Sequence, residues 1–143
     1  MYCTQADILK EVTPDELAGL TGANGTVIDT SKVTQAIEDA QSLIDSYAAI
    51  QFAVPLSGTY ITQRVRKSCA IISLYYLWSN RSNKVGMDDV VKDNFEREVS
   101  FWEDVAKRKA TIGIDPPPAN NSVRNAKVSS NERVFNKDSM TGF

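Results

Sequence analysis

The sequence predicts an all-α protein: a small helical bundle of about three long and two short helices, followed by an extended C-terminal arm. Apolar residues recur every three or four positions in the longer segments, and helix-capping residues stand before most of them. No alternating apolar and polar segment is long enough to build a sheet. The 143 residues suffice for one body with a hydrophobic core. We therefore assign residues 1–115 to a helical body and residues 116–143 to the arm.

The first short helix is expected at about residues 5–12. Thr4 can cap it, because a threonine side chain accepts hydrogen bonds from the free N–H groups of a first turn. Ile8, Leu9 and Val12 fall on one side of this helix, so that side should face the core.

A second short helix is indicated by the segment "TPDEL". Thr13 is its N-cap, Pro14 takes the first helical position, and Glu16 follows the cap by three residues, which is the pattern of a capping box. The segment "TGANGT" ends the helix, and we expect Gly22 and Gly25 to adopt the positive φ that glycine tolerates.

The segment "DTSKVTQAIEDAQSLIDSYAAIQF" predicts the first long helix, because its apolar residues keep helical spacing. The expected buried face consists of Val33, Ile37, Ala40, Ile44 and Tyr47, widened by Ala36, Leu43 and Ile50. The following "AVPLSGTYIT" contains Pro55 and Gly58 and is expected to be an extended connector.

A very apolar helix is expected over about residues 62–80. It begins with the basic residues Arg64, Arg66 and Lys67 and continues as "CAIISLYYLW". This run is too short to span a bilayer. Because it is apolar on nearly every side, it must be covered on more than one side, by the other helices or by a neighbouring subunit.

Asp88 and Asp89 begin the last long helix, where acidic charge suits the positive end of the helix dipole, and Lys107, Arg108 and Lys109 stand at its other end. Its expected buried stripe is Val91, Phe95, Trp102 and Val105, with ion pairs Glu103–Lys107 and Asp104–Arg108. Gly113 is expected to end this helix, and the prolines of "DPPPANN" prevent its continuation.

Little in the sequence points to catalysis. The chain has no histidine, which excludes Ser-His, Cys-His and His-metal arrangements, and it has no phosphate-binding glycine loop. The acidic residues Asp88, Asp89 and Asp93 suit helix capping better than Mg²⁺ binding. Cys3 and Cys69 are far apart in the sequence and are expected to be two ordinary reduced thiols. We expect no enzyme activity, no cofactor, no metal and no small-molecule substrate.

The arm differs from the body in net charge and carries several apolar side chains. Residues 1–115 hold 12 basic and 16 acidic residues, net -4, whereas residues 116–143 hold 4 and 2, net +2. Val134, Phe135, Met140 and Phe143 lie in this otherwise polar segment. They belong either to a disordered terminus with chance aromatics or to an arm that buries them against another chain.

Arg64, Arg66 and Lys67 form the densest basic cluster of the body. They are either a solvated helix entry or a patch that faces an acidic partner or nucleic acid. No aromatic residue is interleaved with them, which weakens the nucleic-acid interpretation.

Four stretches resemble the head-tail adaptor family of Mu-like phages and prophages, small virion proteins encoded near the major capsid protein. These stretches are "MYCTQADILKEVTPDEL", "VTQAIEDAQSLIDSYAAIQFAVPL", "RVRKSCAIISLYYL" and "RVFNKDSMTGF". The resemblance covers essentially the whole chain. It implies a helical virion protein with no catalytic residues, and it makes the segment with Val134, Phe135, Met140 and Phe143 a candidate for gripping the portal or a neighbouring copy.

The resemblance further implies a ring, often of about twelve copies, below the portal of a tailed phage. The expected partners are the portal protein, the next neck or tail component and other copies of the chain, with double-stranded DNA only passing through the channel. The expected location is the virion neck, and the host cytoplasm during assembly, since no secretory signal is evident. The alternative is a small regulatory or nucleic-acid-binding module that uses Arg64, Arg66 and Lys67.

Overall fold

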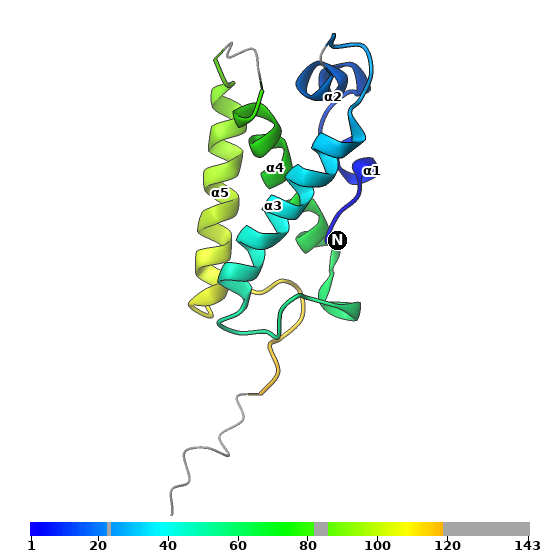
Figure 1. Cartoon of the computed structure of the whole chain (residues 1–143). Coiled ribbons are helices and arrows are strands. Elements are labelled where there is room, and N and C mark those ends of the chain that lie inside the picture. The colour runs from blue at the N-terminus through cyan, green and yellow to red at the C-terminus, as the bar shows by residue number, and fades with distance from the viewer. Residues whose placement is uncertain (23, 82–85, 119–143) are drawn as a thin grey trace, which may run out of the picture.

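The computed structural model describes residues 1–22, 24–81 and 86–118. Its elements are α1 (Gln5–Ile8), α2 (Pro14–Thr21), α3 (Thr30–Ala48), the 3-10 turn η1 (Gly58–Tyr60), α4 (Gln63–Ser79) and α5 (Asp89–Ala106). These residues contain no strand, so the prediction of an all-α bundle with three long and two short helices is confirmed (Figure 1).

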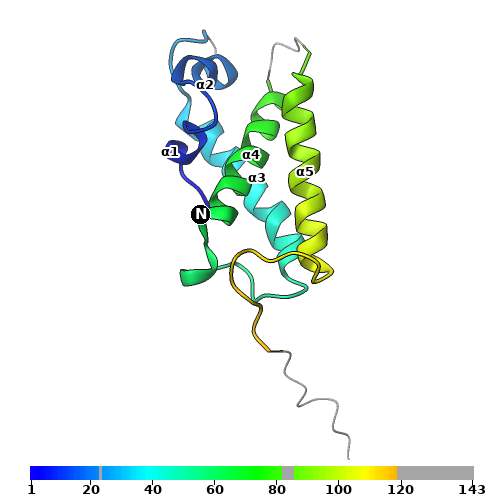
Figure 2. The ribbon, with the colours of Figure 1, turned by 180° about the vertical axis from the view of Figure 1, so that it is seen from behind.

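The three long helices lie along one another, with α3 and α5 running in one direction and α4 in the other (Figure 1). α4 contacts all four of the other α-helices, and its residues Val65, Cys69 and Ile72 are fully buried. α1 and α2 lie against α4 and the start of α3 (Figure 2). The expectation that the apolar helix is covered on several sides is therefore met chiefly by helices of the same chain.

Side-chain caps begin three of the helices, and the capping box that the sequence predicts at Thr13 is present. The N–H of Thr13 donates to Glu16 Oε2 at 3.0 Å, and the N–H of Glu16 donates to Thr13 Oγ1 at 3.3 Å, which completes the capping box. Thr62 Oγ1 accepts from the N–H of Val65, and Asp88 Oδ1 accepts from the N–H of Val90. α2, α4 and α5 thus begin where their caps stand.

The N-terminal segment is tied into the core by Tyr2. Its hydroxyl donates to Asp45 Oδ1 on α3 and accepts from the N–H of Leu56 in the connector. Tyr2 is 2% exposed. Burial and the hydrogen bond with Asp45 raise the pKa of this phenol, so it remains the neutral donor.

The first helix is shorter than predicted, since α1 ends at Ile8 and not near residue 12. The N–H groups of Glu11 and Val12 both donate to the carbonyl of Ile8, so a turn replaces the last helical turn. The reason lies in the next element, because the residue before Pro14 is disfavoured in α conformation and must be the cap of α2. Leu9 and Val12 still pack against the core.

Gly22 does not have the positive φ that was predicted for it. Its φ is -80°, and Gly25 alone of the two has a positive φ, at 69°. Gly22 is required for a different reason, because a Cβ built on it would lie 2.3 Å from the carbonyl oxygen of Val27. The backbone at Val27 passes so close to residue 22 that a side chain there would collide with it.

The buried face of α3 extends less far than predicted. Val33, Ala36, Ile37, Ala40 and Ile44 are buried as expected. Ile50, however, lies beyond the last helical residue and is 64% exposed, because the chain leaves helical geometry after Ala48.

The end of α5 also differs from the prediction. The helix ends at Ala106, well before Gly113, and Arg108 takes the left-handed conformation with φ of 60°. The N–H groups of Lys109 and Ala110 both donate to the carbonyl of Asp104, which closes a wide turn. The chain then folds back instead of continuing as a helix.

This return segment places Ile112 in the core, where it is 0% exposed. Its carbonyl accepts a 2.7 Å hydrogen bond from the hydroxyl of Thr62 at the start of α4. Arg108 donates to Gln51 Oε1, in place of the predicted pair with Asp104. The predicted pair of Lys107 with Glu103 is present at 3.6 Å.

Cys3 and Cys69 are far apart in the sequence, but the fold brings them into contact. Their Sγ atoms are 3.0 Å apart, and both residues are buried between the N-terminal segment and α4.

Candidate interaction surfaces

The cover over α4 is incomplete along its second half. Ile71, Tyr75, Tyr76 and Trp78 are only half-buried, although the residues between them are buried. Trp78 follows Tyr76 by two residues, which places it about 200° around the helix axis. The uncovered apolar surface therefore lies on two different sides of α4.

One uncovered side forms a groove lined by residues of α2, α4 and α5, with α4 as its floor. It has a volume of about 440 Å³. Its apolar lining consists of Val12, Leu20, Ile71, Leu74, Trp78, Val90 and Val91. We call this the α2–α5 groove.

Charged side chains border the α2–α5 groove. Glu11, Glu16 and Asp88 contribute three carboxylates, and Arg81 lies with its guanidinium 5.4 Å from the centre of the Trp78 ring. An apolar floor with a largely acidic border is suited to a segment that presents apolar side chains together with basic ones.

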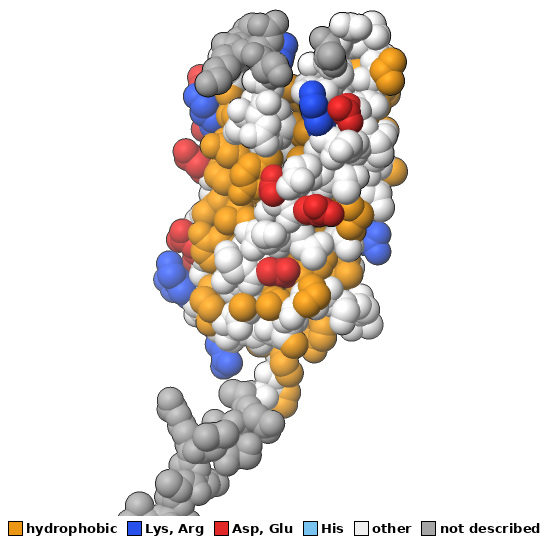
Figure 3. All heavy atoms as spheres, in the orientation of Figure 1, with side chains coloured by type: hydrophobic (Ala, Val, Ile, Leu, Met, Phe, Trp, Pro, Cys, Tyr) orange, Lys and Arg blue, Asp and Glu red, His pale blue; other side chains and the backbone are white. Residues whose placement is uncertain are grey.

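Two shallow hollows lie on the face of α3, and the first of them includes Tyr76 of α4. One is about 470 Å³ and lies between α3 and α4, and the other is about 390 Å³ and lies between α3 and α5. The first is lined by Asp39, Ser42, Leu43, Ser46 and Tyr76, and the second by Tyr47, Ile50, Glu103, Ala106 and Lys107. Figure 3 shows a band of apolar side chains between α3 and α5, bordered by acidic ones. We call this face the α3 band.

Aromatic contacts surround Tyr76, which lines the α3 band. The rings of Tyr75 and Phe95 are stacked with centroids 3.8 Å apart and planes at 11°, and Tyr76 meets Phe95 edge to face at 6.3 Å. Burial raises the pKa of Tyr76, with Asp39 adding to the effect, so its phenol remains neutral. The band therefore presents rigid aromatic surface with a polar hydroxyl, a composition that is enriched where proteins meet.

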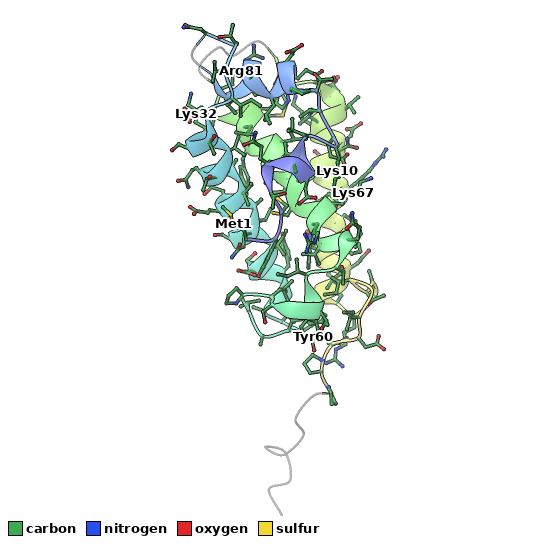
Figure 4. The ribbon with its side chains drawn as sticks, turned by 90° about the vertical axis from the view of Figure 1, so that its right-hand side faces the viewer. Met1, Lys10, Lys32, Tyr60, Lys67 and Arg81 are labelled. Carbon is green, nitrogen blue, oxygen red and sulfur yellow. The ribbon has the colours of Figure 1, made fainter. Side chains whose placement is uncertain are left out.

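The predicted basic cluster is divided by the structure. Arg64 Nη1 donates to Glu98 Oε1 at 3.0 Å, and its guanidinium lies 3.9 Å from the centre of the Phe101 ring. Lys67 lies 3.9 Å from Glu11, on the face made by α1 and the first half of α4 (Figure 4). Arg66 is exposed. The three cations do not form one free patch.

Glu98 is the buried partner of Arg64, and the sequence pattern did not predict this pair. It is 7% exposed and lies in the buried side of α5. A signal was present, because Glu98 follows Phe95 by three residues and precedes Trp102 by four, which puts a carboxylate inside the apolar stripe. A charge at such a position requires a counter-charge from a facing helix.

The arm residues Val134, Phe135, Met140 and Phe143 lie outside the described part of the chain. The described segment that follows α5, residues 107–118, lies at the opposite end of the bundle from α2 (Figure 1).

Residues 1–22, 24–81 and 86–118 contain no group of three or more carboxylate or thiol side chains placed to hold a metal ion. Over the same ranges, no helix combines the length and the apolarity that crossing a bilayer demands.

Comparison with known proteins identifies the family. Residues 2–130 match the model of the family described as Bacteriophage Mu, Gp36. The chain is 26% identical over 147 aligned positions to the Mu-like prophage FluMu protein gp36 of Haemophilus influenzae, across 100% of this chain and 98% of that protein. It is also 26% identical over 117 positions to Gene product J of Escherichia phage Mu, across 80% of this chain and 77% of that protein. The chain therefore belongs to the Bacteriophage Mu Gp36 family of Mu-like phage proteins.

Proposed function

We propose that this protein is a head-tail connector, which forms a ring below the portal and offers a docking surface to the next neck component. The observation that carries the proposal is the uncovered apolar surface on two sides of α4. Exposed apolar surface of this kind marks contacts between proteins. Membership in a family of Mu-like phage proteins supports an assembly role.

A closed ring of identical copies needs two different contact surfaces on each copy, because each subunit meets one neighbour on either side. The α2–α5 groove and the α3 band are such a pair, since Trp78 of the groove and Tyr76 of the band project to different sides of α4. We assign both surfaces to contacts with neighbouring copies.

The C-terminal segment is assigned to a second contact, with the portal or the next neck component. Val134, Phe135, Met140 and Phe143 supply four apolar anchors, and burying one large apolar side chain contributes roughly 1.5 to 3 kcal/mol. The cost of ordering the segment offsets much of this for one copy. In a ring the same contact is repeated, which raises the combined affinity.

The test is complementation of a phage that lacks this protein. Trp78→Glu and Tyr76→Glu each place a charge on one assigned surface, whereas Ser79→Glu changes an exposed neighbour on the same helix and is the control. We expect the first two variants to leave DNA-filled heads without tails in electron micrographs and Ser79→Glu to yield normal particles. Circular dichroism of each purified variant shows whether the bundle still folds. Normal particle yields from folded Trp78→Glu and Tyr76→Glu proteins would reject the two surfaces.

Deletion of residues 131–143 tests the arm separately. The buried core of the described residues extends from Tyr2 to Ile112, so we expect the truncated protein to keep the thermal midpoint of the full chain. We expect it to fail in joining heads to tails. A normal yield of phage with this truncated protein would contradict the proposal that the arm is needed to join heads to tails.

The nucleic-acid-binding alternative has less support, because Arg64 is paired with Glu98 and Lys67 lies near Glu11. An electrophoretic shift assay with duplex DNA at low salt decides it. A salt-dependent shift that Arg66→Gln and Lys67→Gln weaken would favour this alternative over a purely structural role.

A further inference from the structure

The two cysteines of the chain are in direct contact in the core, although they are 66 positions apart in the sequence. Cys3 is 1% exposed and belongs to the N-terminal segment, and Cys69 is 0% exposed and belongs to α4. Their Sγ atoms are 3.0 Å apart. A covalent bond would require them to approach by only about 1 Å, since a disulfide is about 2.05 Å long.

The surrounding contacts hold the two thiols in this position. The hydroxyl of Tyr2, the residue before Cys3, donates a hydrogen bond to Asp45 on α3 and accepts one from the backbone N–H of Leu56. Ser73, one turn after Cys69, donates its hydroxyl to the carbonyl of Cys69 at 2.7 Å. One sulfur is thus carried by a terminal segment and the other by a rigid helix. Because both thiols are buried, a reagent reaches Cys3 only when these contacts of the N-terminal segment open locally.

We propose that Cys3 and Cys69 are a modification site, a dithiol that a small-molecule disulfide oxidises to an intramolecular disulfide joining the N-terminal segment to α4. The inference does not depend on the connector function proposed above. It replaces the expectation of two independent thiols with that of one reactive pair.

The reaction balances with one small-molecule disulfide as oxidant. The Cys3 thiolate attacks one sulfur of the oxidant, forms a mixed disulfide and releases the first small thiolate. Cys69 then loses its proton to that thiolate and attacks Cys3 Sγ, which expels the second small thiolate, and this takes up the proton of Cys3. Two protein thiols are oxidised, and one small disulfide is reduced to two thiols.

The acidity of the two groups fits this order of events. The hydrogen bond with Cys69 lowers the pKa of Cys3 in spite of its burial. The pKa of Cys69 is raised by the same hydrogen bond and by burial. Cys3, which belongs to the N-terminal segment, is assigned as the attacking thiol when this segment opens locally, and Cys69 on α4 is the resolving thiol.

The test measures the equilibrium of the full-length protein with reduced and oxidised glutathione, once in native buffer and once in concentrated urea. Samples are quenched, alkylated under denaturing conditions and weighed as intact protein. We expect the intramolecular disulfide to form at a glutathione ratio at least about 100-fold more reducing in the native protein than in urea, because folding holds the sulfurs together. The oxidised monomer has lost two hydrogens and takes up no alkylating agent.

The disulfide content is measured at equilibrium in both solvents. The native sample is unfolded and refolded in the glutathione mixture, so slow access to the buried sulfurs does not change the result. Cys3→Ser is the control and should form no intramolecular bond under any ratio. The oxidised protein should unfold at a higher temperature than the reduced protein, because a disulfide that closes a long loop lowers the conformational entropy of the unfolded chain. Equal equilibria in buffer and urea would overturn the proposal. So would glutathione retained on Cys3, or a disulfide-linked dimer as the main native product.

Discussion

Arg64 on α4 and Glu98 on α5 form an ion pair in which one guanidinium nitrogen, Nη1, lies 3.0 Å from Oε1 and 2.9 Å from Oε2 of the carboxylate. Only Oε1 is aligned for a hydrogen bond, and Oε2 is buried without one. The pair joins the first turn of α4 to the middle of α5, and the adjacent Phe101 ring covers the guanidinium. It turns part of a predicted surface patch into a contact within the bundle.

Replacing Arg64 with methionine is expected to destabilise the bundle by about 1 to 3 kcal/mol, because Glu98 is then buried without its counter-charge. The value stays in this range because the Arg64 side chain is itself 35% exposed. The double variant Arg64→Met with Glu98→Met should recover part of the loss. Arg66→Met, on the exposed side of α4, should change the free energy of unfolding by less than about 0.5 kcal/mol. Urea titrations followed by tryptophan fluorescence measure all three, and an Arg64→Met protein as stable as Arg66→Met would contradict the pairing.

A second prediction concerns the indole of Trp102, whose Nε1 donates to Ser68 Oγ at 2.6 Å in the core. Ser68→Ala leaves this buried donor without a partner and should cost about 1 to 3 kcal/mol. Ser79→Ala, which removes an exposed hydroxyl from the same helix, is the control and should be nearly neutral. Trp102→Phe, alone and combined with Ser68→Ala, completes a double-mutant cycle that separates the lost hydrogen bond from lost packing. Equal chemical denaturation midpoints for the two serine variants would show that the Trp102–Ser68 hydrogen bond does not contribute to stability.

Two glycines of the α2 region should respond to alanine in opposite directions. Gly22→Ala forces a Cβ to within 2.3 Å of the Val27 carbonyl oxygen, so we expect a loss of about 1 to 3 kcal/mol. Gly19 lies inside α2, and a Cβ there meets nothing within 4 Å. Gly19→Ala should therefore stabilise the protein by about 0.5 to 1 kcal/mol. Thermal unfolding by circular dichroism tests both, and a stable Gly22→Ala protein would contradict the close approach.

The fourth prediction is a pH dependence that comes from Asp7. The hydrogen bond from Lys10 lowers the pKa of this carboxyl, and hydrogen bonds from the N–H and hydroxyl of Thr4 act in the same direction against burial. Because the folded pKa lies below the unfolded value of about 3.9, the stabilisation is present above that value. It is lost as pH falls through the folded pKa.

Asp7→Asn should therefore be less stable than the parent protein at neutral pH, and the difference should shrink as the pH falls through the acidic range. Urea midpoints measured from neutral to acidic pH supply the comparison. Asp93→Asn, on the exposed side of α5, controls for the loss of one acidic charge. A parent-to-variant difference that is the same at every pH would mean that Asp7 acts through shape and not through charge.

The candidate surfaces follow in part from the sequence. The run "CAIISLYYLW" predicted that α4 needed cover on several sides, and the half-burial of Tyr76 and Trp78 shows where that cover is incomplete. The grouping of Trp78 with Val12, Leu20 and Val91 in one groove was not predictable, because these residues come from four segments whose relative placement is a matter of packing.

The sequence by itself determined the long helices, the beginning of α2 through Thr13 with Glu16, and the acidic beginning of α5 at Asp88. These signals act within three or four residues, so they need no knowledge of the fold. Only the tertiary structure decided that Arg64 meets Glu98, that Gly22 is required by Val27, and that Cys3 touches Cys69. Such contacts depend on how helices approach one another, and a local pattern carries no information about that approach.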